Sequence, residues 1–267
     1  MTRVDSMTFA FQHADLLRAR ATAVDFDPHL HGTYSVVVVT HGSAHIWSRR
    51  WSGIVRAGEV FFFNPFEVHA GRSAGGSAQY CVLYPSEAFL ESCTATVGPG
   101  EVRTIRTDVV ARSRSTRALV DALSAPVVDD APVEESLRRV LQECSFSVEA
   151  PASTPMSIAR RTCQLIRRDG LRSTRTDDLA REIGVHPSHL VRSFTKTIGI
   201  PPQTYVRQVR VARARELICA GFGLNEVAQM VNFCDQPHLT REFKKVFGVP
   251  PGALSRGGYR GSPAAGR

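Results

Sequence analysis

The sequence contains no run of eighteen consecutive apolar residues, and its beginning, MTRVDSMTF, lacks the apolar segment of a signal peptide. We therefore expect a protein without a membrane span that stays in the cytoplasm. The six cysteines show no Cys-x-x-Cys or other paired spacing, which indicates reduced, buried thiols rather than a disulfide framework. With 267 residues, 43% of them hydrophobic, the chain is long enough for two domains with a core each.

Acidic residues are scarce in the second half of the chain. Residues 157–267 contain 19 Lys and Arg against 8 Asp and Glu, whereas residues 1–156 contain 14 against 17. The net charge of +8 for the whole chain conceals this division. A basic half joined to a mildly acidic half is typical of a nucleic-acid-binding module attached to a different domain. The alternative is an ordinary solvated surface.

A fourteen-residue pattern occurs twice within the basic half. The pattern His-Leu-x-Arg-x-Phe-x-Lys-x-x-Gly-x-Pro-Pro begins at His189 and again 49 residues later, at His238, and eight of the fourteen positions are identical. A repeat of this period indicates a supersecondary unit that is used two times.

The first copy belongs to a predicted helix-turn-helix. Thr176 is the expected N-cap of a short helix, and Gly184 can adopt the left-handed conformation that ends it. Pro187 then opens a second helix at its first position, where a missing N–H costs nothing. Leu190 and Phe194 are spaced i, i+4, so we expect them to be buried together while the opposite face stays exposed.

The second copy predicts the same unit. Asn232 takes the turn position and Asp235 caps the next helix, whose inner face is formed by Leu239, Phe243 and Phe247. In helix-turn-helix proteins the second helix of the pair lies in the DNA major groove and presents its N-terminal residues to the bases.

The segment between the two units, Gln203 to Ala220, has helical composition throughout. A helix of that length spans about 27 Å at 1.5 Å per residue. It could hold the two second helices about one DNA turn, or roughly 34 Å, apart on one face of a duplex. One chain could then read two successive segments of the major groove.

These residues resemble a known family. The segment from Ser157 to Ser255 is similar to the DNA-binding domain of the AraC/XylS family of bacterial transcription regulators, most densely from Leu224 to Pro251 (LNEVAQMVNFCDQPHLTREFKKVFGVPP). Asn232 stands where the family usually has Gly, and Pro237 replaces a commonly polar residue. Asn tolerates a left-handed turn and Pro is acceptable in a first helical turn, so neither departure conflicts with the fold.

The resemblance implies which side chains contact DNA. The base-edge positions are Ser188, Val191 and Arg192 in the first unit and Gln236, Thr240 and Arg241 in the second, and Lys244 is a further expected DNA contact. Arg can bind guanine and Gln can bind adenine with two hydrogen bonds, while Val or the Thr methyl can contact a thymine methyl. The alternative for the two arginines is contact with phosphate alone. His189 and His238 are interpreted as structural or phosphate-facing, not as metal ligands.

The first 150 residues predict a different architecture. Their β-branched or aromatic runs, separated by turn residues, are Val36–Thr40, Ala44–Ser48, Val60–Phe63 and Ala78–Tyr84. Such short strands favour an antiparallel sandwich or barrel around a pocket. His29-Leu30-His31 and the segment from Gly58 to His69 look like the two cupin motifs, and in the AraC/XylS family such a small barrel commonly serves as the sensory domain.

Three histidines and one tyrosine are the expected effector-binding residues: His29, His31, His69 and Tyr34. The histidines have three possible roles, namely ligands of a divalent metal, hydrogen-bonding partners of an organic effector, or purely structural side chains. A carboxylate usually follows the HxH pair in cupins and is missing here, so we assign no metal ligand and no cofactor. Tyr34 is either a pocket-lining residue or a core aromatic.

Two amphipathic helices are expected between the halves, at Thr116–Leu123 and Val133–Cys144. The apolar stripe of the second helix consists of Leu137, Val140, Leu141 and Cys144. It either packs on the barrel or pairs with the same helix of a second subunit. Val148 to Thr154 is the best candidate for a linker.

The sequence therefore predicts an α+β chain. Residues 1–150 form a cupin-like antiparallel β-barrel with accessory helices, residues 155–255 form an all-α domain with two helix-turn-helix units joined by a linker helix, and residues 256–267 form a disordered tail. We expect a sequence-specific transcription regulator, not an enzyme, that a small molecule in the barrel modulates. Its expected partners are double-stranded DNA, this effector, a second copy of the chain and, if it activates transcription, RNA polymerase.

Two rival functions remain open. The first is a metal-dependent cupin enzyme that carries a DNA-binding tail, and near-stoichiometric metal in the purified protein would favour it. The second is a constitutive architectural DNA binder, which nearly equal affinity for random and selected duplexes would favour.

Overall fold

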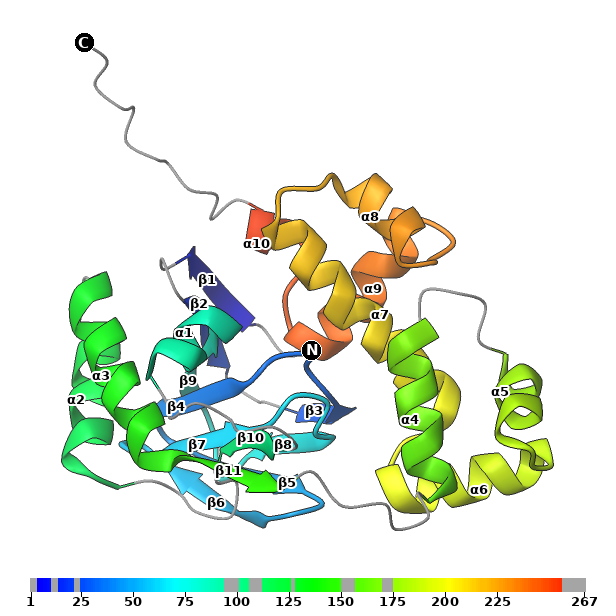
Figure 1. The fold of residues 1–267 in the computed structure, drawn as a ribbon. Coiled ribbons are helices and arrows are strands. Elements are labelled where there is room, and N and C mark those ends of the chain that lie inside the picture. The colour runs from blue at the N-terminus through cyan, green and yellow to red at the C-terminus, as the bar shows by residue number, and fades with distance from the viewer. Residues whose placement is uncertain are drawn as a thin grey trace.

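The computed structural model describes residues 4–10, 14–21, 25–93, 101–105, 112–125, 128–149, 157–169 and 175–255. Strands dominate the N-terminal half and helices the C-terminal half (Figure 1). The α+β organisation predicted from the sequence is therefore confirmed. None of the helices in these ranges is long and apolar enough to span a membrane.

The N-terminal domain contains two antiparallel sheets that face each other. One sheet has the order β1 (Val4–Ala10), β2 (Ala14–Ala21), β9 (Ala78–Pro85), β4 (Ser35–His41) and β7 (Val60–Phe63). The other has the order β3 (Asp25–His29), β8 (His69–Ser73), β5 (Ser43–Ser48) and β6 (Ser52–Arg56). The four runs of β-branched and aromatic residues singled out in the sequence all form strands, β4, β5, β7 and β9.

Successive side chains of β4 point to opposite faces of the larger sheet. Val37 and Val39 point toward the opposite sheet and pack with its residues, whereas Val36 and Val38 belong to the core on the other face. This follows from the two-residue period of a strand. Strand β4 is therefore buried on both faces, which explains its continuous run of valines.

Helices cover the outer face of the larger sheet. They are α1 (Glu87–Cys93), α2 (Arg114–Ser124) and α3 (Asp130–Cys144), and a two-stranded sheet of β10 (Glu101–Ile105) and β11 (Ser145–Glu149) lies beside them. Leu137, Val140 and Leu141 of α3 are fully buried in this chain's own core. The apolar stripe therefore packs on the sheet, and pairing with a second subunit is not needed to cover it.

The predicted linker needs a correction. Val148 and Glu149 are not linker residues, because β11 pairs them with β10. The β-branched Val148 and the alternation of Ser145–Glu149 favour a strand over the small residues that follow. The rest of the predicted linker and the tail 256–267 lie outside the described residues.

The C-terminal domain is helical. Its helices are α4 (Ile158–Asp169), α5 (Thr176–Ile183), α6 (Pro187–Ile198), α7 (Pro202–Cys219), α8 (Leu224–Met230), α9 (Gln236–Phe247) and α10 (Gly252–Ser255). The two helix-turn-helix units are α5–α6 and α8–α9, with α7 as the connecting helix (Figure 1). This is the arrangement that the duplicated pattern predicts.

Most of the predicted turn and cap residues are confirmed. Gly184 ends α5 in the left-handed conformation, with φ of 79°, and Asn232 adopts φ of 62° at the turn between α8 and α9. The Asp235 side chain accepts a hydrogen bond from the His238 N–H at 2.6 Å. Asn232 can replace the usual glycine because a short polar side chain tolerates this region of backbone space.

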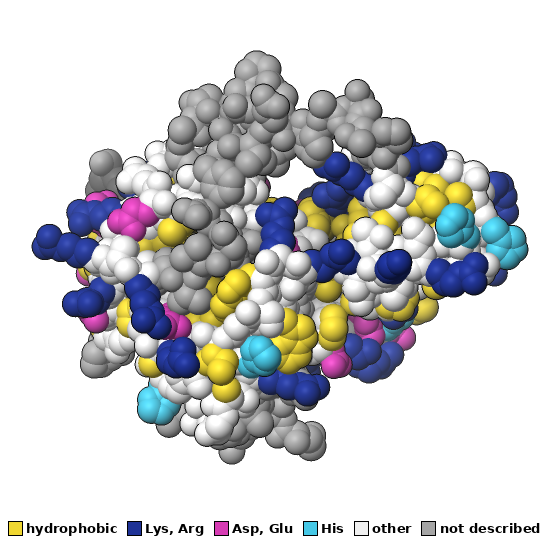
Figure 2. Space-filling model, turned by 90° about the horizontal axis from the view of Figure 1, so that it is seen from below, with side chains coloured by type: hydrophobic (Ala, Val, Ile, Leu, Met, Phe, Trp, Pro, Cys, Tyr) yellow, Lys and Arg dark blue, Asp and Glu magenta, His cyan; other side chains and the backbone are white. Residues whose placement is uncertain are grey.

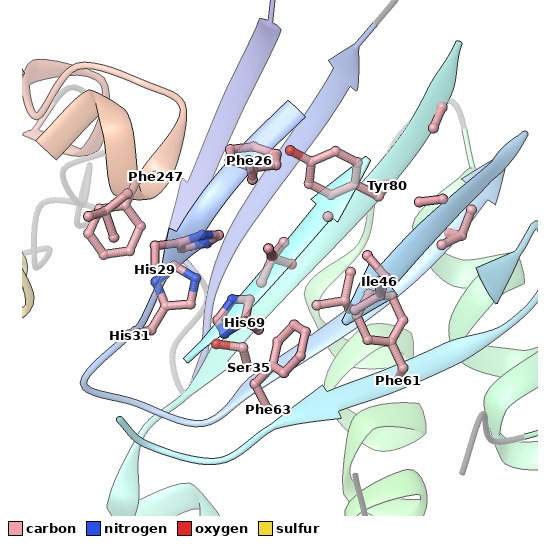
Figure 3. A pocket seen from close by; sticks show the side chains of 18 of the residues that line it. Phe26, His29, His31, Ser35, Ile46, Phe61, Phe63, His69, Tyr80 and Phe247 are labelled. Atoms are coloured by element: carbon pink, nitrogen blue, oxygen red, sulfur yellow. The ribbon is translucent and has the colours of Figure 1, made fainter. Parts of the chain in front are cut away.

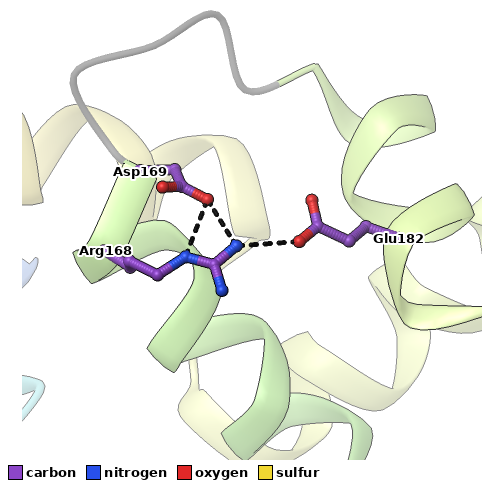
Figure 4. Close-up of polar contacts among 3 residues, drawn as sticks. All are labelled: Arg168, Asp169 and Glu182. Carbon is purple, nitrogen blue, oxygen red and sulfur yellow. Dashed lines mark hydrogen bonds and ion pairs between the residues drawn. The ribbon is translucent and has the colours of Figure 1, made fainter.

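The predicted cap of α5 is wrong by one residue. Arg175 holds the N-cap position, without a capping side-chain hydrogen bond, and Thr176 is the first helical residue. The Thr176 hydroxyl instead accepts a hydrogen bond from the Gln203 amide of α7 at 3.2 Å. Nearby, Arg168 at the end of α4 pairs with Asp169 and with Glu182 of α5 at 2.7 and 2.9 Å (Figure 4). These contacts link the first helix-turn-helix to the helices on either side of it.

The two domains share one core. The apolar cluster between the sheets continues into α7, α8 and α9, and Leu30 of the N-terminal domain packs among α4, α6 and α7. The Gln208 amide of α7 donates a hydrogen bond to the Pro28 carbonyl at 3.1 Å. The DNA-binding half is therefore packed directly against the N-terminal half.

The cysteines are free thiols, as expected, but not all of them are buried. Cys81, Cys93 and Cys163 are buried and Cys144 is half-buried, whereas Cys219 and Cys234 are exposed. Cys219 is the last residue of α7, and Cys234 lies just before α9.

Candidate functional site

A cavity of about 80 Å³ lies between the two sheets. Strands β4, β7 and β9 form one wall, and strands β3, β5 and β8 form the other. Most of the lining is aliphatic or aromatic; the lining residues with polar side-chain atoms are His29, His31, Ser35, His69, Tyr80 and Tyr84. This volume is several times what one water molecule requires.

The three predicted histidines converge at one end of this cavity (Figure 3). Their ring centroids are 4.3 to 5.1 Å apart. His29 and His69 are opposite each other in the register of β3 and β8, and His31 lies two residues after the end of β3. The HxH spacing and strand pairing thus bring three residues from two distant parts of the sequence together.

Two of the imidazoles are oriented by backbone carbonyls. His29 Nδ1 lies 2.8 Å from the carbonyl oxygen of Asp27, and His69 Nδ1 lies 2.8 Å from that of Glu67. A carbonyl only accepts hydrogen bonds, so each Nδ1 carries the proton and each Nε2 has a lone pair. The Phe63 ring stacks on His69 with centroids 3.6 Å apart, which fixes the plane of that imidazole.

Burial keeps the histidines neutral. It lowers the pKa of His29 from 6.5 to about 4, although the Asp27 carbonyl acts in the opposite direction. Burial, reinforced by the neighbouring imidazole of His29, also lowers the pKa of His31 and of His69. Near pH 7 the cluster therefore offers uncharged nitrogen donors and acceptors.

Two buried polar atoms of the cavity wall, His31 Nδ1 and Ser35 Oγ, have no hydrogen-bond partner in the described part of the chain. Such groups are normally satisfied, so each is suited to bind a ligand atom. Ser35 was not predicted as a site residue, although the two-residue period from Val37 and Val39 places it on the cavity face. Phe26 and Tyr80, whose ring centroids lie 6.3 Å apart, also line the cavity (Figure 3). They were missed because the strand register could not be read from the sequence.

Tyr34 is the one predicted effector residue that the structure does not bring to the cavity. It is buried among the residues between the larger sheet and α1, α2 and α3. The same alternation that turns Ser35 inward turns Tyr34 to the opposite face. Its packing matches the core-aromatic interpretation that the sequence left open.

The helical domain closes one side of the cavity. Val246 and Phe247, the last residues of α9, are among its lining residues. The Phe247 ring centroid is 5.0 Å from that of His31 and 6.1 Å from that of Tyr84. Arg215 of α7 is also buried here, with its guanidinium carbon 4.4 Å from the centroid of the Tyr84 ring. The wall of the cavity and the second helix-turn-helix thus share side chains.

The predicted DNA contacts lie on accessible parts of α6 and α9. In α6, Ser188 and Arg192 are exposed and Val191 is half-buried; in α9, Arg241 and Lys244 are exposed and Gln236 and Thr240 are half-buried. The inner-face residues Leu190, Phe194, Leu239 and Phe243 are fully buried. Each helix therefore has a buried side that fixes it to its domain and an accessible side.

Basic side chains are numerous on the face drawn in Figure 2, including its right-hand end, where α5 and α6 lie in Figure 1. Exposed Lys and Arg residues near a helix-turn-helix provide the electrostatic attraction that DNA phosphates require.

Comparison with known proteins agrees with this architecture. Residues 12–149, more than half of the chain, match the AraC-like ligand-binding domain, and residues 179–257 match a helix-turn-helix domain. The chain belongs to the AraC family. It is a transcription regulator with a DNA-binding domain and a ligand-binding domain, so the resemblance stated from the sequence is confirmed.

Two relatives illustrate the similarity. YbfI of Bacillus subtilis, an uncharacterized HTH-type transcriptional regulator, is 24% identical over 237 residues, which cover 85% of this chain and 86% of YbfI. The structure of ToxT from Vibrio cholerae is similar with a TM-score of 0.53 at 11% identity, over 92% of this chain and 99% of ToxT. A ToxT structure with bound unsaturated fatty acid is similar with a TM-score of 0.51 at 14% identity, over 94% and 92% of the two chains. At these identities the structural likeness concerns the fold alone.

Proposed function

We propose that a small molecule in the cavity controls how this regulator binds specific DNA sequences. One observation carries the proposal: α9 contributes Phe247 to the cavity wall and, nearer its N-terminus, presents Gln236, Thr240 and Arg241 on its accessible side. A helix of this length moves as a rigid body, so a ligand that repositions Phe247 also repositions the other end.

We assign DNA contacts to seven side chains: Ser188, Val191, Arg192, Gln236, Thr240, Arg241 and Lys244. Their exposure supports this assignment. Arg192 and Arg241 are suited to guanine and Gln236 to adenine, while Lys244, near the end of α9, is suited to phosphate.

Selection of bound duplexes from a random pool tests sequence-specific binding. It should return two short motifs about one helical turn apart, and affinity should fall steeply with salt concentration because bound phosphates release counterions. Equal affinity for random and selected duplexes would contradict the proposal and favour an architectural DNA binder.

The role of Arg241 can then be isolated with a matched pair of variants. Arg241→Ala should weaken binding by about 1–3 kcal/mol and relax the preference at one base position. Arg117→Ala removes the same charge from the exposed surface of α2 in the N-terminal domain and should leave the preference unchanged. A uniform loss of affinity for all sequences with Arg241→Ala would show that this residue contacts phosphate alone.

The cavity supports a compact effector with an apolar body and a polar group at one end. The aliphatic and aromatic walls suit the body, and His29, His31 and His69, together with Ser35, suit the polar end. Tyr34 is left out of this assignment because it faces away from the cavity. The protein senses a ligand rather than transforming one, in keeping with its family.

Coupling between the cavity and DNA is testable without knowing the effector. Tyr84→Leu removes a ring that contacts both Phe247 and Arg215. We expect this variant of the N-terminal domain to change the affinity for the selected duplex about fivefold or more, within the usual range of allosteric coupling. Phe89→Leu is the matched control, because Phe89 is an equally buried aromatic ring on the opposite side of the larger sheet. Equal effects of both substitutions would mean that general destabilisation, and not the contact with α9, changes the affinity.

Other features remain predictions. They are the domain limits 1–150 and 155–255, a homodimer, and contact with RNA polymerase if the protein activates transcription. A homodimer would have to use a surface other than the apolar stripe of α3, since that stripe is buried within the chain.

A further inference from the structure

The end of the cavity where the histidines meet has the composition of a metal centre. One ring nitrogen from each of His29, His31 and His69 lies within 4.8 Å of the others. Three nitrogens bound to one tetrahedral ion at about 2.0–2.1 Å lie about 3.3 Å from one another. The ring nitrogens therefore need to approach one another by at most about 1.5 Å to bind one ion.

The surroundings orient the rings for this purpose. The carbonyl oxygens of Asp27 and Glu67 hold the protonated Nδ1 atoms of His29 and His69, which leaves both Nε2 lone pairs available. Histidines that bind metals almost always donate their second ring N–H to such an outer partner. The same carbonyl contact, two residues before each histidine, occurs on both strands.

His31 supplies an independent observation. Its side chain is more than nine-tenths buried, lines the cavity and has an Nδ1 atom without a hydrogen-bond partner. A buried polar atom left unsatisfied is destabilising. An ion bound by this Nδ1 atom would remove that cost.

We propose that His29, His31 and His69 bind one divalent transition-metal ion. Three neutral imidazoles suit zinc, nickel, cobalt or iron(II), whereas magnesium and calcium prefer oxygen ligands, and no carboxylate is among the described residues that line the cavity. In a tetrahedral site, three protein ligands leave one further coordination position. That position suits water or an oxygen donor of an organic effector.

This site deepens the proposed function, because the ion would form the polar end of the effector pocket. Its presence does not depend on the coupling to DNA. Loss of metal binding and loss of the effect of Tyr84→Leu on DNA affinity are therefore separate outcomes.

Metal titration of the full chain tests the proposal. The protein is purified without a histidine tag, treated with a chelator, and titrated with Co²⁺ and Zn²⁺ by calorimetry and visible absorption. We expect one ion per chain and the cobalt spectrum of a low-coordinate site with nitrogen ligands. Absence of stoichiometric binding would overturn the proposal.

Variants locate the ion. His31→Gln and His69→Gln should each weaken metal binding by more than about 100-fold. Loss of a residue that only hydrogen-bonds to a ligand would weaken it by about 10- to 100-fold. His45→Gln is the matched control, since His45 is an exposed histidine on β5 of the same domain, and it should bind as the unmodified protein does. Undiminished binding in both cluster variants would overturn the assignment.

X-ray absorption of the zinc-loaded, unmodified protein gives an answer even if a variant fails to fold. It should show imidazole nitrogens at about 2.0–2.1 Å. Sulfur at about 2.3 Å would mean that cysteines, of which the chain has six, bind the ion instead.

Discussion

The contact between Tyr84 and Arg215 should stabilise the association of the two domains to a measurable extent. Arg215 is buried, and its guanidinium carbon lies 4.4 Å from the Tyr84 centroid and 6.0 Å from that of Phe247. Cation–π contacts within about 6 Å contribute roughly 0.5–1 kcal/mol when exposed and about 2 kcal/mol when desolvated. Because Arg215 is buried, we expect a coupling energy of about 1–2 kcal/mol.

A double-mutant cycle measures this coupling. Tyr84→Leu and Arg215→Met each remove one partner while keeping an apolar side chain in place, and the double variant removes both. Each single substitution also loses packing, so only the difference between the sum of the single effects and the double effect reports the pair. Urea unfolding provides the free energies. A coupling energy below about 0.5 kcal/mol would refute this account of the interface, since independent sites add within that range.

Two optical signals show whether the coupling joins domains. Both tryptophans of the chain, Trp47 and Trp51, lie in the N-terminal domain, whereas far-ultraviolet circular dichroism follows mainly the helices. The two transitions should coincide in the unmodified protein and separate in the double variant. The cycle of Phe89→Leu with Arg138→Met serves as a control, because that cation–π pair, at 5.0 Å, lies within the N-terminal domain. It should leave the transitions coincident.

Two further predictions concern stability. In metal-free protein the contribution of His29 to the free energy of unfolding should be fully present well above pH 6.5. It should be lost as the pH falls toward 4, by about 3 kcal/mol, because the unfolded chain takes up a proton that the buried imidazole does not. Urea unfolding at several pH values checks this, and a slope that His29→Gln leaves unchanged would assign the effect to other groups. Asp235→Ala should destabilise the protein by about 1 kcal/mol through loss of the cap of α9. Asp177→Ala, at an exposed position in α5, should have a smaller effect. Thermal unfolding of both variants measures the difference.

Local signals made most of the helical domain predictable. Gly184, Pro187, Asn232 and Asp235 each specify a backbone conformation or a cap through their own chemistry, and the structure confirms all four. Thr176 failed as a cap because its hydroxyl has a partner 27 residues away, in α7. A contact of that kind is set by tertiary packing and leaves no trace in local sequence.

The cavity was predictable only in part for the same reason. The HxH pair and His69 lie at or just beyond strand ends. The two cupin-like motifs indicated that these histidines meet in the barrel, and the pairing of β3 with β8 brings them together. Tyr34 and Ser35 are adjacent, and the choice of which one faces inward depends on the register of β4, because a shift of one residue exchanges the two faces. Phe247 was expected in the core of its own unit, and it does contact Phe243 at 4.6 Å. That the same ring also reaches the N-terminal domain depends on how the domains pack.

The double role of Phe247 sets a condition for any effector. Suppose that α9 can pack on the N-terminal domain in two ways, the one described here and another. A ligand can then shift the equilibrium between these two arrangements only to the extent that it binds one of them more tightly than the other. A molecule that contacts the strands alone would bind both arrangements equally and leave DNA binding unchanged. A ligand that contacts Phe247 would bind the two arrangements with different affinity. The same holds for a ligand that draws His31 toward a metal ion and away from the Phe247 ring, whose centroid lies 5.0 Å from that of His31. The helix that carries the exposed Arg241 would then respond to the histidine cluster through a single aromatic contact.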